Sequence, residues 1–253
     1  MKKKILLKGP LLTRSGYGEQ SRFALRALRN RSDTFDVYIQ PLNWGVTSWL
    51  IENNEERQWI DQAIEKTIGF IQQGGQFDMS LQITIPNEWE KIAPVNIGYT
   101  AGIEATKVAP QWLEKCNLMD KIITISNFSK SAFEQTSYEA VEQQTGRKMV
   151  LKNTTPLSVV NYPVKNYNDL PSLDLDLDYD FNFLIVAQFG VRKNLENTIK
   201  WFIEEFKNDE VGLVVKTNLA KNCLMDREAV MQKMKHLVKK TEDTKCKVYL
   251  LRG

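Results

Sequence analysis

Residues 2–28 read KKKILLKGPLLTRSGYGEQSRFALRAL, and the order of elements in this stretch sets the expectation for the fold. The short apolar run from Ile5 to Leu7 is typical of a buried strand. The run stops at Gly9-Pro10, and a helical pattern starts near Gly18. A strand, a glycine-containing loop and a helix are the opening of a parallel α/β domain. The stretch therefore predicts a loop at the carboxyl end of the first strand.

The same alternation continues along the chain. Further strands are predicted, from their apolar and β-branched character, at residues 35–42, 77–83, 95–100, 121–126, 156–164, 181–189, 211–217 and 246–253. Helices are predicted, from apolar residues at helical spacing, at residues 18–30, 55–72, 127–137, 194–207 and 226–240. Strands that alternate with helices favour parallel sheets in an α/β fold.

An acidic stretch divides the chain. Residues 166–180, NYNDLPSLDLDLDYD, combine Asn, Pro and closely spaced Asp, which favours a linker over an edge strand. We expect a Rossmann-like domain over residues 1–165, an acidic linker over 166–180 and a partial second Rossmann-like domain over 181–253. Three strands and two helices are few for a doubly wound domain, so we expect the second part to leave an apolar edge or face exposed.

Composition excludes several classes of protein. The net charge of +3 in 253 residues does not argue for a nucleic-acid partner, and no 18-residue apolar run predicts a membrane span. Cys116, Cys223 and Cys246 lie far apart, which disfavours a zinc site and fits a reduced, cytoplasmic location. His236 is the only histidine, so a histidine-based triad or a multi-histidine metal site is disfavoured.

The loop TRSGYG at residues 13–18 has two interpretations. Glycines let a backbone approach a ligand closely, and the following helix directs free N–H groups at the loop, which suits a phosphate. Gly16 and Gly18 are the two glycines concerned. The third glycine of G-x-G-x-x-G and the GK[ST] of a P-loop are missing, so an ordinary strand–helix turn explains the loop equally well.

Three longer stretches resemble the GT-B glycosyltransferases, in particular their large retaining group called family 4. The first is residues 96–136, whose matching positions are Glu104, Pro110, Trp112, Asp120, Ser126, Phe128, Lys130 and Phe133. The second is residues 181–206, in which a basic pair precedes a helix, and the third is VGLVVKTN at residues 211–218. The resemblance implies a GT-B-like fold and transfer of a sugar, with retention, from a nucleotide sugar to a glycan, lipid or protein acceptor.

The resemblance also implies roles for individual residues. Arg192 and Lys193 would hold the donor phosphates with Lys216, and Gly16 and Gly18 would line the same cleft. The alternatives from the residues alone are a solvated basic turn and an ordinary lysine at a strand end.

Glu104 is the carboxylate that we expect to act on the acceptor or the sugar, although a surface glutamate explains it as well. We expect Gly16 and Arg192 to lie at strand carboxyl edges that face one cleft. No metal and no resident cofactor are expected, because clustered cations at a helix start can stabilise a leaving diphosphate.

The chain departs from the family where its second domain would continue. The family's later glutamate-containing segment is not reached by residue 253. We therefore expect a truncated transferase with little activity, covered by a second copy or a companion chain. The alternatives are a non-catalytic module that binds a glycan or a partner, and a nucleotide-dependent oxidoreductase. No acidic residue ends the second predicted strand, which disfavours the oxidoreductase.

Two further sets of residues have mainly structural interpretations. Arg22, Arg26 and Arg29 recur at helical spacing and predict a solvated basic face, with a membrane surface as a less favoured partner. Trp44 and Trp49 follow the second strand, where aromatic faces suit either packing or a sugar ring.

Overall fold

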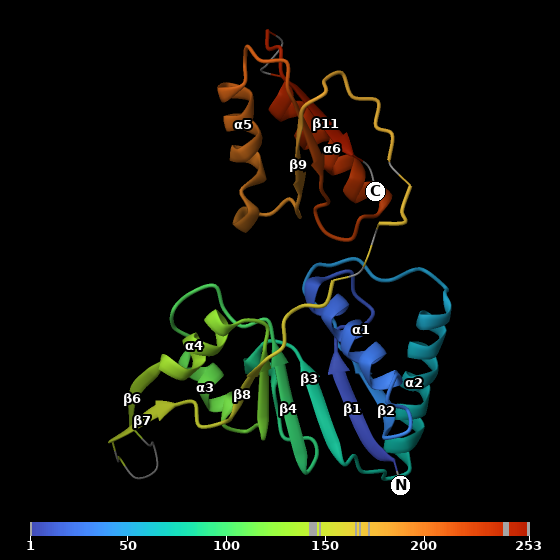
Figure 1. Ribbon diagram of the computed structural model, residues 1–253, viewed down its shortest axis with the longest axis vertical. Helices are drawn as coiled ribbons and strands as arrows, with labels where there is room; N and C mark the ends of the chain where they lie inside the picture. The colour runs from blue at the N-terminus through green and yellow to red at the C-terminus, as the bar shows by residue number, and fades with distance from the viewer. Residues whose placement is uncertain are drawn as a thin grey trace. The chain divides into compact units, whose positions relative to one another are not determined.

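The chain folds into two compact α/β units (Figure 1). The structure, a computed structural model, describes residues 2–141, 146, 148–164, 166, 168–171, 173–239 and 243–251. The first unit comprises residues 1–45 and 49–165, and the second comprises residues 46–48 and 166–253. The predicted ends of the last helix and strand, at residue 240 and residues 252–253, lie outside the described part of the chain.

Eight strands and four α-helices are found in the described part of the first unit. The strands are β1 (Lys3–Gly9), β2 (Phe35–Pro41), β3 (Met79–Ile83), β4 (Val95–Thr100), β5 (Lys121–Thr124), β6 (Ser137–Val141), β7 (Lys148–Lys152) and β8 (Leu157–Val159). The helices are α1 (Gly16–Arg29), α2 (Glu55–Gln72), α3 (Pro110–Cys116) and α4 (Asn127–Gln135), with a 3₁₀ turn η1 (Pro86–Glu88).

Six of these strands form a parallel sheet in the order β2-β1-β3-β4-β5-β8. Side chains alternate between its faces. Ile5 and Leu7 face one side, where Leu25 of α1 and Ile60 of α2 complete a core. Ile122 faces the other side, where α3 and α4 join a second core around Trp89. Helices on both faces of a parallel sheet are the expected doubly wound arrangement, so the predicted α/β class is confirmed (Figure 1).

The predicted solvated basic face of α1 is wrong. Arg22 is only 6% exposed, and its guanidinium donates to carbonyl oxygens of the preceding loop. Arg26 forms a two-bond pair with Glu56 of α2, at 2.9 Å for each bond. Arg29 lies over the ring of Trp59, 4.8 Å from its centroid. Arg22 thus holds the loop before α1, while Arg26 and Arg29, with side chains 32% and 35% exposed, join α1 to α2.

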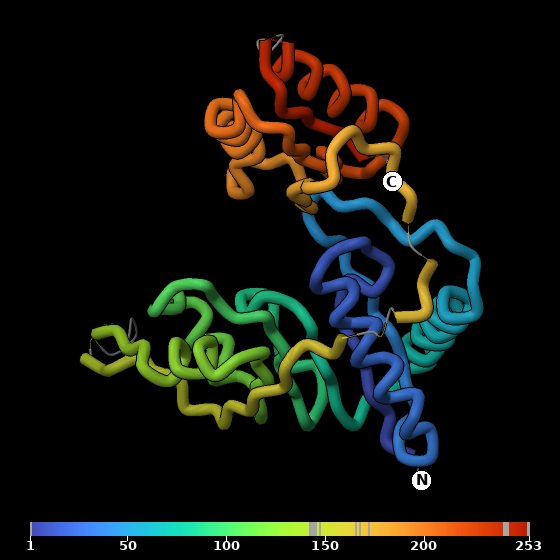
Figure 2. Tube along the Cα trace, turned by 45° about the horizontal axis from the view of Figure 1, so that its top comes forward, coloured from blue at the N-terminus to red at the C-terminus, as the bar shows by residue number. Residues whose placement is uncertain are grey.

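The hairpin β6–β7 was not predicted. It is antiparallel, pairing Ser137 with Lys152 and Val141 with Lys148, and it extends away from the six-stranded sheet in Figures 1 and 2. Its strands have only five residues each, so the sequence offers little signal. The neighbouring β8 has only three residues, where the sequence predicted a strand over residues 156–164.

The second unit contains one three-stranded parallel sheet in its described part. Its elements are β9 (Asn182–Val186), η2 (Val191–Lys193), α5 (Leu195–Glu205), β10 (Gly212–Lys216), α6 (Leu224–Val238) and β11 (Lys247–Leu251). The strand order is β11-β10-β9. The end of the acidic stretch is fastened to this sheet, because Asp178 accepts a hydrogen bond from the Tyr249 hydroxyl at 2.8 Å and pairs with Lys247.

Both helices of the second unit pack on one face of its sheet. Ile199 of α5 and Met234 of α6 share a core with Leu213 and Val215 of β10. On the outer strand β9, Leu184 and Val186 stay 65% and 67% exposed. This observation confirms the expectation that the second part leaves apolar surface uncovered.

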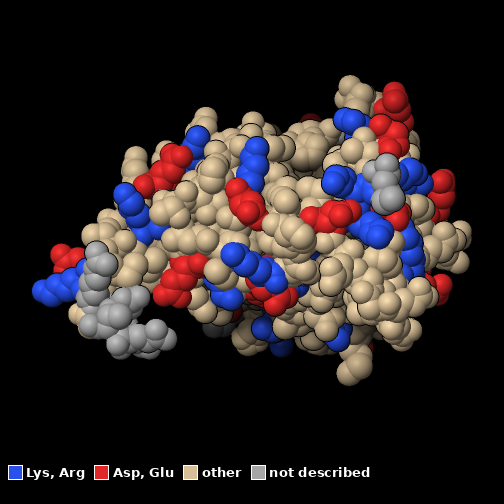
Figure 3. All heavy atoms as spheres, turned by 90° about the horizontal axis from the view of Figure 1, so that it is seen from below, with Lys and Arg blue, Asp and Glu red and all other residues tan. Residues whose placement is uncertain are grey.

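Charges are interspersed on the face of the molecule seen in Figure 3, where basic and acidic side chains alternate over short distances. In the described part of the chain, every helix is too short or too polar to cross a membrane. Cys116 and Cys246 are buried and Cys223 is exposed, all three as free thiols.

Candidate functional site at the carboxyl edges of the two sheets

The sheet of the first unit has a topological switch point between β1 and β3. From β1 the chain proceeds to β2 on one side, and β3 then lies on the other side of β1. Ligands of open parallel sheets bind beyond the strand carboxyl ends at such a point. The segments that come together there are the β1–α1 loop, the residues after β3 and the residues after β4.

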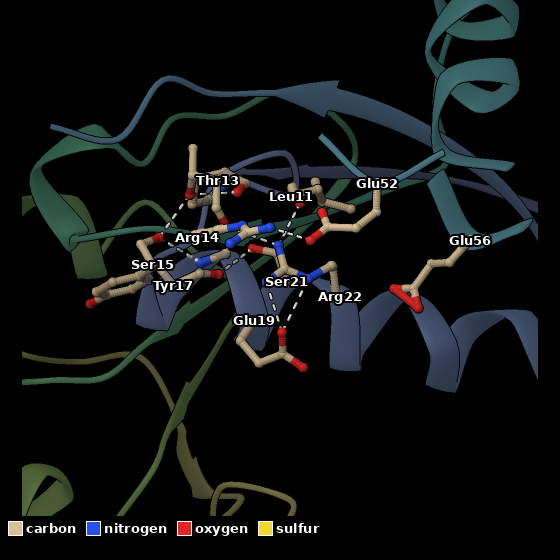
Figure 4. Close-up of polar contacts among 12 residues, drawn as sticks. Leu11, Thr13, Arg14, Ser15, Tyr17, Glu19, Ser21, Arg22, Glu52 and Glu56 are labelled. Atoms are coloured by element: carbon tan, nitrogen blue, oxygen red, sulfur yellow. Dashed lines mark hydrogen bonds and ion pairs between the residues drawn. The ribbon is translucent and has the colours of Figure 1, made fainter. Parts of the chain in front are cut away.

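The β1–α1 loop is held by its own polar side chains (Figure 4). Ser15 caps α1, since its hydroxyl accepts the Gly18 backbone N–H at 2.9 Å. Thr13 contacts that Ser15 hydroxyl at 2.8 Å. The buried guanidinium of Arg22 donates to the carbonyls of Leu11 and Thr13 at 2.7 and 2.9 Å. These contacts determine the loop conformation without any bound molecule.

The two glycines of the loop serve different purposes. Neither has positive φ. A Cβ on Gly18 would collide with the Thr13 carbonyl oxygen and lie 3.0 Å from that of Pro10, so the helix start can approach the loop only without a side chain. A Cβ on Gly16 would meet nothing within 4 Å. Close packing thus explains Gly18, while Gly16 is open toward any group that approaches the helix start.

The two glycines provide a matched pair of substitutions. We expect Gly18→Ala to lower the free energy of unfolding by about 2 kcal/mol, because the loop backbone must move. Gly16→Ala should be neutral or stabilise the fold by up to about 1 kcal/mol, since Ala restricts the unfolded chain more than Gly. Urea denaturation of the two variants measures the difference. Equal stability of both would contradict the packing role given to Gly18.

Tyr17 connects the start of α1 to the end of β4. Its hydroxyl lies 2.8 Å from the Thr100 hydroxyl and accepts the Ala101 backbone N–H at 3.1 Å. Trp44, from the loop after β2, packs on the Tyr17 ring with a centroid distance of 4.5 Å. Burial raises the pKa of Tyr162 to about 12, with Tyr17 among its electrostatic neighbours. Aromatic rings with polar tips therefore gather at this edge of the sheet.

Glu104 lies beyond β4, as predicted, but its side chain is solvent-exposed. No hydrogen bond or ion pair joins it to another described residue. The predicted Ser126–Asn127 helix start is present, and Ser126 is the cap, accepting the Ser129 backbone N–H at 3.1 Å.

Glu88 is a second exposed carboxylate near this edge, and it was not singled out from the sequence. It lies in η1, five residues past the end of β3, and its side chain makes no hydrogen bond or ion pair with the described residues. The pKa of the Glu88 carboxyl is raised by burial, and the positive charge of Lys8 opposes that shift. The only indication in the sequence is that this glutamate follows a buried strand by a few residues.

In the second unit, the predicted basic residues meet at the carboxyl edge of the sheet. Arg192 and Lys193 follow β9, and Lys216 ends the adjacent β10. The two connections run side by side, because Ala187 N–H donates to the Lys216 carbonyl and Phe189 N–H to the Asn218 carbonyl. All three basic side chains are exposed, and no described carboxylate pairs with any of them.

The start of α5 has an unusual backbone conformation. Asn194 occupies the cap position with a left-handed backbone, φ 50°, and its side chain does not cap the helix. It accepts a hydrogen bond from Asn197 instead, at 2.8 Å. A pocket of about 430 Å³ opens beside this turn, and Lys233 lines it while lying 5.1 Å from the centroid of the Phe189 ring.

Within the described ranges, no three His, Cys, Asp or Glu side chains are grouped so as to hold a metal ion. The polar groups at the two sheet edges are instead cations, hydroxyls, amides and the two exposed carboxylates of Glu88 and Glu104, both unpaired within the same ranges.

The comparisons with known proteins found solved structures of similar fold but no similar sequence. No protein-family model and no curated protein sequence matches the chain. Among solved structures, the apo form of the lipopolysaccharide outer core galactosyltransferase WaaB is 10% identical with a TM-score of 0.48, over 99% of this chain and 68% of that one. A mutant of the Thermobaculum terrenum O-GlcNAc transferase is 11% identical with a TM-score of 0.45, and the match covers 98% of this chain and 44% of that chain. Acinetobacter baumannii MurG is 9% identical with a TM-score of 0.45, and the match covers 100% of this chain and 67% of that chain.

The chain has two α/β units, each built on a parallel sheet. Two such sheets in one chain are what the resemblance to GT-B glycosyltransferases implied, so the α/β class with two parallel sheets is confirmed.

Proposed function

We propose that this chain is a glycosyltransferase that moves a sugar from a nucleotide-sugar donor to an acceptor hydroxyl. The donor phosphates bind at the carboxyl edge of the second unit, and the acceptor binds at the carboxyl edge of the first. Retention of the anomeric configuration is part of the proposal and derives from the family resemblance alone.

The observation that carries the proposal is the set of unpaired cations in the second unit. Arg192, Lys193 and Lys216 have no carboxylate partner among the described residues. In the first unit, by contrast, Arg22 and Arg26 are both paired with carboxylates. Cations that the fold does not neutralise, next to a helix start at a strand carboxyl end, suit a phosphate group.

In sugar transfer, such a cluster of cations would stabilise the leaving group. When the bond from the sugar to the diphosphate breaks, negative charge develops on the leaving nucleoside diphosphate. Cations fixed in position stabilise that charge, and the reaction then needs no metal ion for this purpose.

The acceptor side of the proposal rests on the first unit. The half-buried rings of Tyr17 and Trp44 pack on each other at this edge, where the Tyr17 hydroxyl contacts the buried Thr100. Aromatic faces with adjacent hydrogen-bonding groups suit the alternating apolar and hydroxyl surface of a sugar or a similar polyol. That the acceptor is a glycan, a lipid or a protein is implied by the family resemblance alone.

A second candidate is a non-catalytic module that binds a glycan or a partner chain. The exposed apolar residues Leu184 and Val186 on β9 favour it, because proteins usually cover such surface. A second copy of the chain or a companion chain would then pack against this strand.

Titration calorimetry and a turnover assay separate the two candidates. UDP, GDP, ADP and their glucose, galactose, N-acetylglucosamine and mannose conjugates are titrated into the chain, and release of the diphosphate is then followed. We expect at least one nucleotide to bind and its sugar conjugate to be turned over at a low rate. A chain that binds free glycans or associates with a partner, but binds none of the nucleotides, would favour the non-catalytic module.

A further inference from the structure

The outer strand β9 of the second unit forms an uncharged sheet edge. It lies at one end of the order β11-β10-β9. Its pairing with β10 continues past both ends of the strand, because Gly212 N–H donates to the Phe181 carbonyl and Phe189 N–H to the Asn218 carbonyl. Residues 181–189, FNFLIVAQF, therefore run along this edge, and they include neither a charged residue nor a proline. Natural edge strands usually carry such residues, since these residues prevent pairing with another chain.

The other edges of the two parallel sheets are protected. The end of the acidic stretch is fastened to β11 through Asp178 and the Tyr249 hydroxyl, 2.8 Å apart. In the first unit, the edge strand β2 carries Asp36, which pairs with Lys66 of α2, and it ends at Pro41. The opposite edge strand, β8, has only three residues. Within the described parts of these sheets, β9 is thus the one edge strand without a charge, a proline or a covering segment.

This edge offers both unpaired backbone groups and apolar side chains. Phe181, Ala187 and Phe189 use their backbone groups to bond the chain of β10, so those of the alternate residues point away from it. No other described strand pairs with β9 on that side. The side chains of Leu184 and Val186 are 65% and 67% exposed, and that of Phe181 is 62% exposed. An added strand would satisfy the backbone and cover these side chains together.

The two ends of the edge carry opposite charges. Asp180 immediately precedes residues 181–189, and Arg192 and Lys193 follow them. All three side chains are exposed, and none forms an ion pair with another described residue. A second β9 running antiparallel would bring the acidic end of each copy to the basic end of the other. A parallel arrangement would bring like charges together. The edge is therefore self-complementary about a two-fold axis.

We propose that β9 pairs antiparallel with β9 of a second copy of this chain and joins the two three-stranded sheets into one. With Leu184 opposite Val186 of the other copy, Asp180 lies opposite Gly190 and diagonal to Arg192, within reach of a long side chain. One carboxylate beside two cations leaves net positive charge at this end, so a phosphate can still bind there. The inference does not depend on the proposed glycosyltransferase function.

The test measures the mass of the 253-residue chain by sedimentation equilibrium, without nucleotide, over a range of protein concentrations. Leu184→Lys/Val186→Lys places two charges on the proposed interface. Leu224→Lys/Met225→Lys is the matched control, because both of its residues are 82% exposed at the start of α6. All four positions are exposed, so the fold should tolerate the charges, and circular dichroism checks that it does.

We expect the mass of the natural chain to rise toward that of a dimer between about 1 and 100 µM, the range of a weak interface. Leu184→Lys/Val186→Lys should weaken dimerisation at least tenfold, by about the effect of like charges at an edge. The control should dimerise as the natural chain does. A natural chain that stays monomeric throughout would overturn the proposal and leave the edge to a different partner. Equal dimerisation of both variants would assign the association to another surface and also overturn it.

A charge reversal tests the antiparallel direction. Asp180→Lys makes both ends of the edge basic and should weaken dimerisation by about tenfold, since two symmetric contacts become repulsive. Adding Arg192→Glu and Lys193→Glu to that variant exchanges the charges of the two ends and should restore the natural dimerisation. A reversed chain that dimerises no better than Asp180→Lys would overturn the antiparallel pairing. Because mass is the readout, failure here leaves the nucleotide titration of the proposed function unaffected.

Discussion

Replacing Arg192 and Lys193 together by alanine should weaken nucleoside diphosphate binding by about 3 kcal/mol, which is about 140-fold in the dissociation constant. Each charged hydrogen bond to phosphate is worth about 1.5–3 kcal/mol, and two that hold the same group do not add fully. The stability of the free protein should change little, because both side chains are exposed and unpaired in the described structure. Calorimetric titration of the diphosphate measures the loss.

The chain offers a control for this prediction. Lys207 and Lys239 are also exposed, and they follow the ends of α5 and α6 at the opposite, amino edge of the same sheet. Their double alanine variant removes the same net charge, so it reveals any effect of charge alone. Affinity lost equally in both double variants would assign the effect to the overall field of the protein. Natural affinity in a folded Arg192→Ala/Lys193→Ala chain would remove these residues from the donor site.

Arg22→Ala should be the most damaging single substitution on α1, lowering the free energy of unfolding of the first unit by about 3 kcal/mol. The side chain is 6% exposed and donates two charged hydrogen bonds, to the Leu11 and Thr13 carbonyls. Without it, both buried carbonyl oxygens lose a partner, and the β1–α1 loop loses the group that holds it. Arg22→Lys should also destabilise, because one ammonium cannot reproduce the planar fork of the guanidinium.

Tryptophan fluorescence during urea denaturation reports this change selectively, since five of the six tryptophans lie in the first unit. Arg31→Ala is the control. Arg31 pairs with Asp33 at 3.5 Å, with both side chains more than half exposed, and its loss should cost no more than about 0.5 kcal/mol. If Arg22→Ala unfolds at the same urea concentration as Arg31→Ala, the loop does not depend on the Arg22 contacts.

Periodic patterns predicted most of the secondary structure. The helix expected over residues 55–72 is α2, and the strand expected over residues 95–100 is β4, both with the same bounds. Such segments are decided locally, because apolar residues at a spacing of about 3.6 define one face of a helix and β-branched runs favour strands. The hairpin β6–β7 was missed because each of its strands has only five residues.

The sequence also located the basic residues of the second unit. Residues that follow successive parallel strands must lie at one edge of the sheet, so the positions of Arg192, Lys193 and Lys216 in the sequence were sufficient. Their lack of carboxylate partners, by contrast, is visible only once the surrounding side chains are placed.

The role of the arginines of α1 was decided only by the tertiary structure. By itself the sequence determined the α/β class, the parallel order of elements and the edge at which polar residues collect, because these follow from local periodicity and chain direction. It could not show that Arg22 is buried. The contacts and burial of a side chain depend on residues brought together from distant parts of the chain, so no local sequence pattern predicts them.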